Sequence, residues 1–104
     1  MANHRLSGNS FKSCDMGFKN FKALLEPTLG SDHELINIPD SPAGNLIALS
    51  ELPGIKTELE AIKSTWAADE EIKNTWNCVY ICALIESLEL AISNNENLEF
   101  LNEN

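Results

Sequence analysis

Two cysteines spaced four residues apart, Cys78 and Cys82, are the nearest approach to a metal-binding pair in this chain. On a helix, both thiols would lie on one face, and His33 or Cys14 would have to supply further ligands. A structural zinc site gathers four ligands in close pairs, and neither His4 nor His33 has a fixed spacing to the cysteines. We therefore expect no metal and no cofactor, with Cys78 as a small core residue and Cys82 half exposed.

A second candidate for chemistry is the carboxylate pair Glu86 and Glu89, which suggests general acid–base catalysis. Such a pair needs a cleft and a pKa shifted by burial, and a solvated helix stripe supplies neither. The chain also lacks a Gly-rich phosphate loop, a nucleophile elbow and a Ser-His-Asp arrangement. The sequence therefore predicts no catalytic residues and no enzyme.

Charge is unevenly distributed along the 104 residues. The first 25 residues carry four basic side chains and one carboxylate, whereas residues 74–104 carry five carboxylates and no Lys or Arg. The net charge of −9 therefore divides into +3 at the N-terminal end and −12 over the remainder. A chain this acidic repels phosphate backbones and bilayer surfaces, so we expect no direct binding to nucleic acid or membrane.

Length and cysteine content indicate one small domain in a reducing compartment. Three cysteines make a poor disulfide framework, which favours the cytoplasm. The N-terminus lacks the apolar core of a signal peptide, and the longest apolar run, Cys78 to Ile85, has eight residues against the ~20 of a membrane span. We expect a flexible tail over 1–9, a single helical domain over 10–93 and an acidic C-terminal tail over 94–104.

Apolar spacing predicts a first helix from Ser10 that Pro27 terminates. After it, Glu34 to Ile38 has the composition of a short extended piece. Ser41-Pro42 is typical of a helix start and Pro53-Gly54 of an end, which predicts a short helix to about Leu52. The alternative is a hairpin that pairs Leu35 to Ile38 with Leu46 to Leu49.

Two further helices follow. The first carries a narrow apolar seam made of Ile55, Leu59, Ile62 and Trp66. The second is expected from about Asp69 to Ser93, with Asp69 capping its first turn and Asn94-Asn95 ending it. These elements predict an all-α fold, a small bundle of three to four helices packed around a long C-terminal helix.

The apolar side chains of that last helix cover most of its circumference, more than two short neighbours would cover. Part of the helix is therefore expected in an interface, and we expect a homodimer. Large apolar and aromatic residues are the usual anchors of such interfaces. The predicted protein-interface residues are Trp76, Tyr80, Ile81, Leu84, Ile85, Leu88, Ile92, Phe18 and Phe21.

From Glu34 to Ser93 the layout resembles a family of short helical proteins common in pseudomonads. Its members carry a C-terminal helix with Trp, then Tyr-Leu four residues on, then further apolar residues, and here the matching positions are Trp76, Tyr80-Ile81, Leu84 and Leu88. Asn77 and Cys78 depart from the small residues usual after the tryptophan. In size and helical character the chain is also similar to a quorum-sensing antiactivator, which implies inhibition of a transcriptional activator by contact.

Two functions follow as expectations. In the first, the protein is an acidic regulator that inhibits a partner protein by covering its surface with the apolar ridge of the last helix. In the second, it is a phage-type nucleic-acid mimic, of the anti-restriction or anti-CRISPR kind, that blocks a nucleic-acid-binding enzyme. The carboxylates expected to imitate phosphates are Glu58, Glu60, Asp69, Glu70, Glu71, Glu86 and Glu89.

Overall fold

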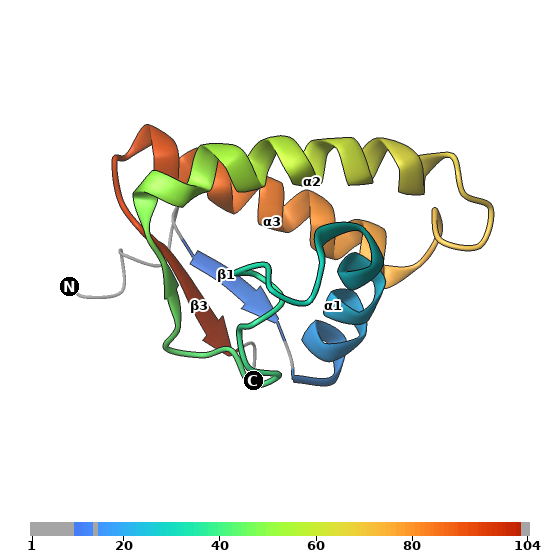
Figure 1. Ribbon diagram of the computed structural model, residues 1–104, viewed down its shortest axis with the longest axis horizontal. Helices are drawn as coiled ribbons and strands as arrows, with labels where there is room; N and C mark the ends of the chain where they lie inside the picture. Colours follow the sequence, from blue (N-terminus) through green and yellow to red (C-terminus); the bar gives the residue numbers. More distant parts are fainter. Residues whose placement is uncertain (1–9, 14, 103–104) are drawn as a thin grey trace.

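The two ends of the chain meet in one small β-sheet, and three helices pack together over it (Figure 1). The computed structural model describes residues 10–13 and 15–102. Its elements are, in chain order, β1 (Ser10–Ser13), α1 (Asp15–Leu29), β2 (Leu46–Ile47), the 3-10 turn η2 (Leu49–Glu51), α2 (Leu52–Ala67), α3 (Trp76–Ser93) and β3 (Leu98–Asn102).

The sheet has the strand order β1-β3-β2, so the C-terminal strand lies in the middle. β1 runs parallel to β3, with Phe11 opposite Phe100, and β2 runs antiparallel to it, with Ile47 opposite Leu98. All four of these side chains are buried. Because side chains alternate across a strand, they share the face of the sheet that packs against the helices.

Aromatic rings fill the space between that face and the helices. The Phe11 ring lies 5.9 Å from Phe100, 6.1 Å from Tyr80 and 6.4 Å from Phe21, measured between ring centroids. Phe18 and Phe21 both point inward from α1. β1, β3, α1 and α3 each contribute at least one of these rings, so the cluster joins all four elements.

α2 and α3 form an antiparallel pair (Figure 1). The expected seam of α2 is confirmed, since all its members are buried, with Leu52 added: Leu52, Ile55, Leu59, Ile62 and Trp66. From α3 the buried residues are Ile81, Leu84, Ile85, Ser87, Leu88 and Ala91. α3 therefore lies with one side against α2, α1 and the sheet.

The expectation of an all-α fold is wrong, because the molecule combines three helices with a three-stranded mixed sheet. Ser10 to Ser13 form β1 instead of the first turn of a helix. The spacing of Phe11 to Phe18 mimics a helical face, but the strand is specified by its pairing with residues almost 90 positions away. Local periodicity contains no information about such a partner.

The same distant pairing changes the C-terminal segment. Leu98 to Asn102 form β3, the central strand, where the sequence had indicated an acidic tail with a small apolar cluster. Leu98 and Phe100 are fully buried. The end of α3 is confirmed, since Asn94 is its C-cap and Asn95 adopts a left-handed φ of 60°.

Two prolines were assigned the wrong role. Pro53 lies in the first turn of α2, where a missing N–H costs nothing, so residues 41–51 form turns, β2 and η2 instead of a helix ended by Pro53-Gly54. Pro27 lies inside α1, which continues to Leu29 and ends at Gly30 with a φ of +95°.

Neither extended prediction for residues 34–38 holds. The segment forms turns, and Leu46–Ile47 pairs with β3 and not with residues 35–38, which excludes the alternative hairpin. Leu35 and Ile38 are nevertheless buried in the core. The loop is fastened by Lys22, whose ammonium donates to the Ile38 carbonyl oxygen and pairs with Asp40 at 2.9 Å.

The last helix is shorter than expected. Asp69 accepts a hydrogen bond from the Glu71 backbone N–H at 2.8 Å, but this bond closes only a turn. α3 begins at Trp76 and is capped by Thr75, whose hydroxyl accepts from the Asn77 N–H. Residues 69–75 therefore form a protruding loop, seen at the right of Figure 1.

By length and hydropathy α3 would suffice to cross a bilayer, a property that core helices of soluble proteins share. Here it packs against α2, α1 and β1 within a globule whose Cα radius of gyration is 13.0 Å. That is the radius expected of a folded soluble domain of about 100 residues.

Because α3 has a buried side and an exposed side, a charge should destabilise the protein strongly at one of two nearby leucines and only slightly at the other. We expect Leu88→Glu to unfold the protein, since Leu88 is fully buried and an unpaired charge there costs several kcal/mol. Leu90, at 46% exposure, should accept Glu at a cost within about 1 kcal/mol. Circular dichroism during urea titration measures both, and a folded, equally stable Leu88→Glu variant would contradict this packing.

Candidate protein-binding site

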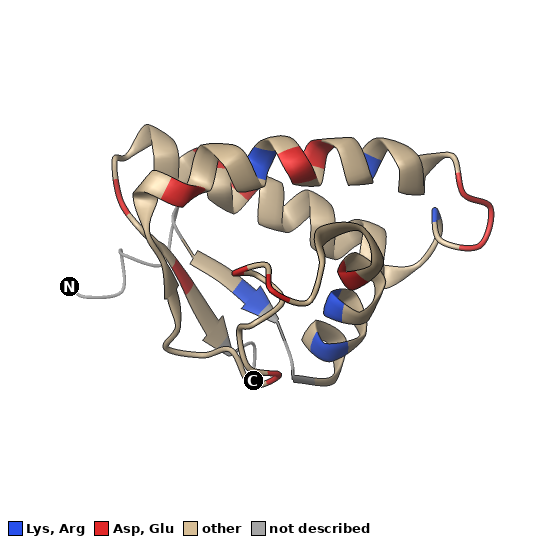
Figure 2. Cartoon of the chain, viewed as in Figure 1, with Lys and Arg blue, Asp and Glu red and all other residues tan. Residues whose placement is uncertain are grey.

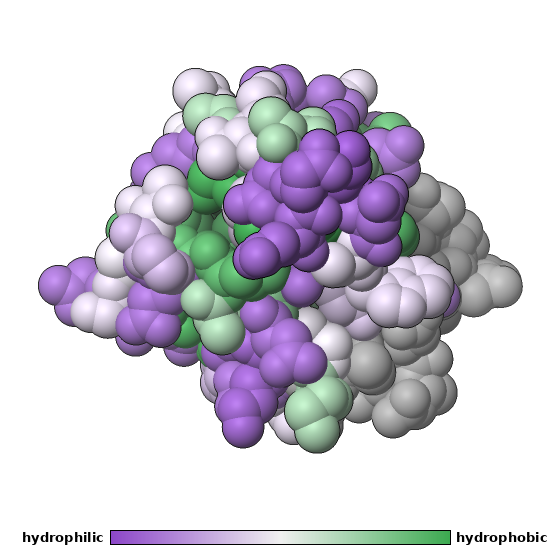
Figure 3. Space-filling view, turned by 90° about the vertical axis from the view of Figure 1, so that its right-hand side faces the viewer, coloured by the Kyte–Doolittle hydropathy of each residue, from purple (hydrophilic) through white to green (hydrophobic). Residues whose placement is uncertain are grey.

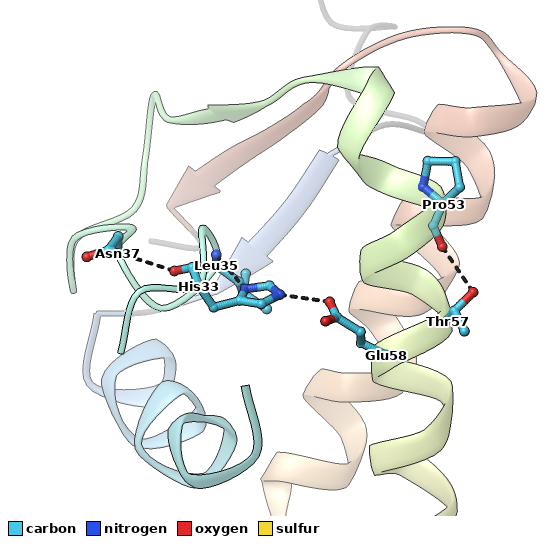
Figure 4. A network of polar contacts seen from close by, with 6 residues as sticks. All are labelled: His33, Leu35, Asn37, Pro53, Thr57 and Glu58. Atoms are coloured by element: carbon cyan, nitrogen blue, oxygen red, sulfur yellow. Dashed lines mark hydrogen bonds and ion pairs between the residues drawn. The ribbon is translucent and has the colours of Figure 1, made fainter. Parts of the chain in front are cut away.

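A polar network is built around His33, in the loop after α1 (Figure 4). The Leu35 backbone N–H donates to His33 Nδ1 at 3.0 Å, so the ring proton is on Nε2, which donates to Glu58 Oε1 at 2.8 Å. Glu58 belongs to α2, 25 residues away, and sequence spacing did not indicate this pair.

Both ring nitrogens of His33 are therefore occupied by protein groups. A general base needs one nitrogen free to accept a proton from a substrate. The hollow of about 350 Å³ beside it is lined by Glu34, Glu51 and Glu58 as well as by His33 itself. This network fastens the loop to α2.

The cysteine pair on α3 is not placed as a metal site. The Cys78 thiol donates to the Ile72 carbonyl oxygen at 3.3 Å, and burial, with a smaller contribution from Cys82, raises its pKa. Cys82 is exposed, and residues 10–13 and 15–102 contain no group of three or more His, Cys, Asp or Glu side chains able to hold a metal ion.

The predicted interface residues separate into three groups by exposure. Six are buried in the core of this chain and cannot reach a partner without unfolding: Ile81, Leu84, Ile85, Leu88, Phe18 and Phe21. Tyr80 and Ile92 are half-buried, and Trp76 is 76% exposed. Only Trp76 of the predicted set is therefore fully available at the surface.

The surface of α3 that remains open carries a regular row of residues, which we call the outer stripe: Trp76, Val79, Ala83, Glu86 and Leu90. Steps of three and four residues keep them on one side of the helix. Val79 is 52% and Leu90 46% exposed, and Ala83 is half-buried. The sequence prediction missed Val79 and Leu90, although Glu86, lying in the same row, marks the side that faces water.

At its N-terminal end the outer stripe opens into a groove of about 540 Å³ between α3 and the start of α1. Met16, 67% exposed, lies on one wall, and Trp76 and Tyr80 lie on the other. The groove is lined by Met16, Gly17, Asn20, Thr75, Trp76, Asn77 and Tyr80, none of them charged. Figure 3 shows this end of the molecule, with the hydrophilic loop that precedes α3 toward the viewer.

Gly17 determines how closely the two walls approach. A Cβ at this position would lie 2.2 Å from the Tyr80 hydroxyl oxygen and under 3 Å from its ring carbons. The Tyr80 ring is itself held by edge contacts to Phe11 and Phe21. The glycine therefore lets the hydroxyl end of Tyr80 approach α1 closely at one wall of the groove.

Positively and negatively charged residues are unevenly distributed over the elements of the chain (Figure 2). α3 contains Glu86 and Glu89 and no Lys or Arg. Lys73, in the preceding loop, is paired with Glu70 at 3.0 Å. Lys12 lies on β1, and Lys19 and Lys22 lie on α1, whereas the charged side chains of α3 itself are both acidic.

No protein-family model, curated protein or solved structure matches this chain. The resemblance to the pseudomonad family and to an antiactivator therefore stays a prediction.

Gly17→Ala tests the close contact between α1 and α3. We expect it to destabilise the protein by about 1–3 kcal/mol, because the Tyr80 ring must leave its place between two phenylalanines. Gly54→Ala is the matched control, since Gly54 is also helical and its Cβ would meet nothing within 4 Å. This control should gain about 0.4–1 kcal/mol. Equal effects of the two substitutions in urea unfolding would contradict the contact.

Proposed function

We propose that this protein is a regulator that binds another protein and inhibits it by covering its surface. The observation that carries the proposal is the outer stripe, where Trp76, Val79 and Leu90 are exposed on one side of a helix whose other side is fully packed. Together with Met16 across the groove, these side chains place four large apolar residues at the surface around one helix, which favours a binding role.

The chemistry of the described residues supports a binding role over a catalytic one. Trp76 is large, rigid and exposed, the properties of an interface anchor. Met16 on the opposite wall is flexible and adapts to a partner side chain. We propose that inhibition is of the antiactivator type, in which the partner loses a surface that it needs for its own assembly, and that the protein acts in the cytoplasm.

The nucleic-acid mimic is the weaker candidate. Its carboxylates are spread over α2, the loop at 69–71 and α3, and lysines are interspersed among them. Lys56 lies 3.1 Å from Glu60 and 3.6 Å from Glu89, which reduces the negative field that a mimic of phosphates needs. The exposed apolar side chains of the outer stripe favour binding to a protein surface over imitation of a nucleic acid.

The test is affinity capture with three tagged forms of the full chain, followed by identification of the captured protein. We expect wild type and Leu46→Gln to capture the same partner and Trp76→Glu to lose it, because a charge at Trp76 must be desolvated in the contact. Leu46 is a matched control, an apolar residue of β2 with 57% exposure.

The captured partner is then assayed for its own activity and assembly with and without added protein. Inhibition by wild type and not by Trp76→Glu supports the proposal. Capture that Trp76→Glu retains, or a partner whose activity and assembly are unchanged on binding, would contradict it.

A further inference from the structure

We infer that the segment bound on the outer stripe is an amphipathic helix of the partner that carries basic residues beside its apolar seam. This inference rests on the proposed function and specifies the kind of partner. It follows from three properties of the stripe: its spacing, its central small residue and the sign of its charge.

The spacing fits a helix. Trp76, Val79, Ala83, Glu86 and Leu90 follow steps of three, four, three and four, the repeat with which two helices pack side by side. The row is about 21 Å long from Trp76 to Leu90, at 1.5 Å per residue. About four turns of a partner helix would cover it.

The middle of the row permits close approach. Ala83 has a single methyl group and lies between the larger Val79 and Leu90. A small residue at the centre of a helix crossing lets the two axes come near each other, while the larger residues on both sides fill the gaps. The groove beside Trp76 then receives a large apolar side chain at one end of the partner helix.

The acidic residues of α3 indicate which charge the partner helix carries beside its apolar seam. Glu86 lies within the row and forms no ion pair among the described residues, and Glu89 shares Lys56 with Glu60. An apolar or acidic helix would remove water from Glu86 without compensation. A lysine or arginine on the partner would instead pair with it, so complementarity selects a basic helix.

A second copy of this chain is a poorer occupant. Antiparallel pairing of two outer stripes would place Ala83 at the two-fold axis, Trp76 against Leu90, and Glu86 against Val79 of the other copy. Each Glu86 would then face an apolar residue. The contact would also join two chains that each carry a net charge of −9.

The experiment uses two synthetic 18-residue helical peptides with leucines at alternating steps of three and four. One carries lysines on both flanks of the seam, and the other carries glutamates at the same positions. Binding is followed by isothermal titration and by tryptophan emission, because Trp76 is exposed whereas Trp66 is already buried. We expect the lysine peptide to bind at least tenfold more tightly and to shift the emission to shorter wavelength.

Substitutions in the full chain then locate the contact. Trp76→Ala should abolish binding of the lysine peptide, and Glu86→Gln should weaken it about fivefold. Glu34→Gln makes the same change of charge in the loop after α1, away from α3, and should leave the affinity within twofold. Affinity should also fall as salt rises from 50 to 500 mM.

The inference would be overturned by equal affinity for the two peptides, by equal effects of Glu86→Gln and Glu34→Gln, or by a wild-type dimer in sedimentation that Trp76→Glu dissociates. Preference for neutral lipid vesicles over the lysine peptide would overturn it too. If the peptide fails while a partner is still captured through Trp76, the helix inference is wrong and the proposed function stands. If the peptide does not bind and no partner is captured through Trp76, both the helix inference and the proposed function are wrong.

Discussion

Burial of Phe11 is the constraint on which the rest of the structure depends. This residue lies on β1, yet its ring contacts rings from α1, α3 and β3. For Phe11 to be covered, the first and last described strands must pair and α3 must lie across them. Ser87 adds a polar contact to the same junction, because its hydroxyl donates to the Ser10 carbonyl oxygen at 2.8 Å. The N-terminal strand, the C-terminal strand and the most apolar helix are thereby fixed together.

This constraint also decides which side of α3 remains open. Its inner residues fill the space above the aromatic rings and against α2, so Leu84 and Leu88 have no exposed surface. Trp76, Val79 and Leu90 point away from that core and have no apolar cover among the described residues. The surface available for recognition is therefore the outer stripe, the part of this largely apolar helix that the core does not cover. Its single acidic residue, Glu86, makes that surface negatively charged.

The sequence predicted what local periodicity determines. The seam of α2 was predicted correctly, because its spacing depends on helix geometry alone. Phe18 and Phe21 were expected in an interface, and they lie instead in the core of the chain. The sheet was missed because Phe11 and Phe100 are far apart in the chain and each strand is short. Pro53 was misassigned because proline is found both at the start and after the end of helices. Trp76 was named as an interface residue, whereas Met16 and Val79 needed the tertiary arrangement to show that they stay exposed.

The most direct test of this arrangement is native-state hydrogen exchange of the Phe100 amide, measured by NMR. Its N–H donates to the Asn45 carbonyl oxygen at 2.9 Å from the central strand of the sheet. If pairing of the chain ends around Phe11 holds the fold together, this amide exchanges only through global unfolding, with a free energy close to that from urea denaturation. Exchange at the rate of an unstructured peptide, while the amides of α2 and α3 stay protected, would show that the C-terminal segment is a free tail and would contradict the account.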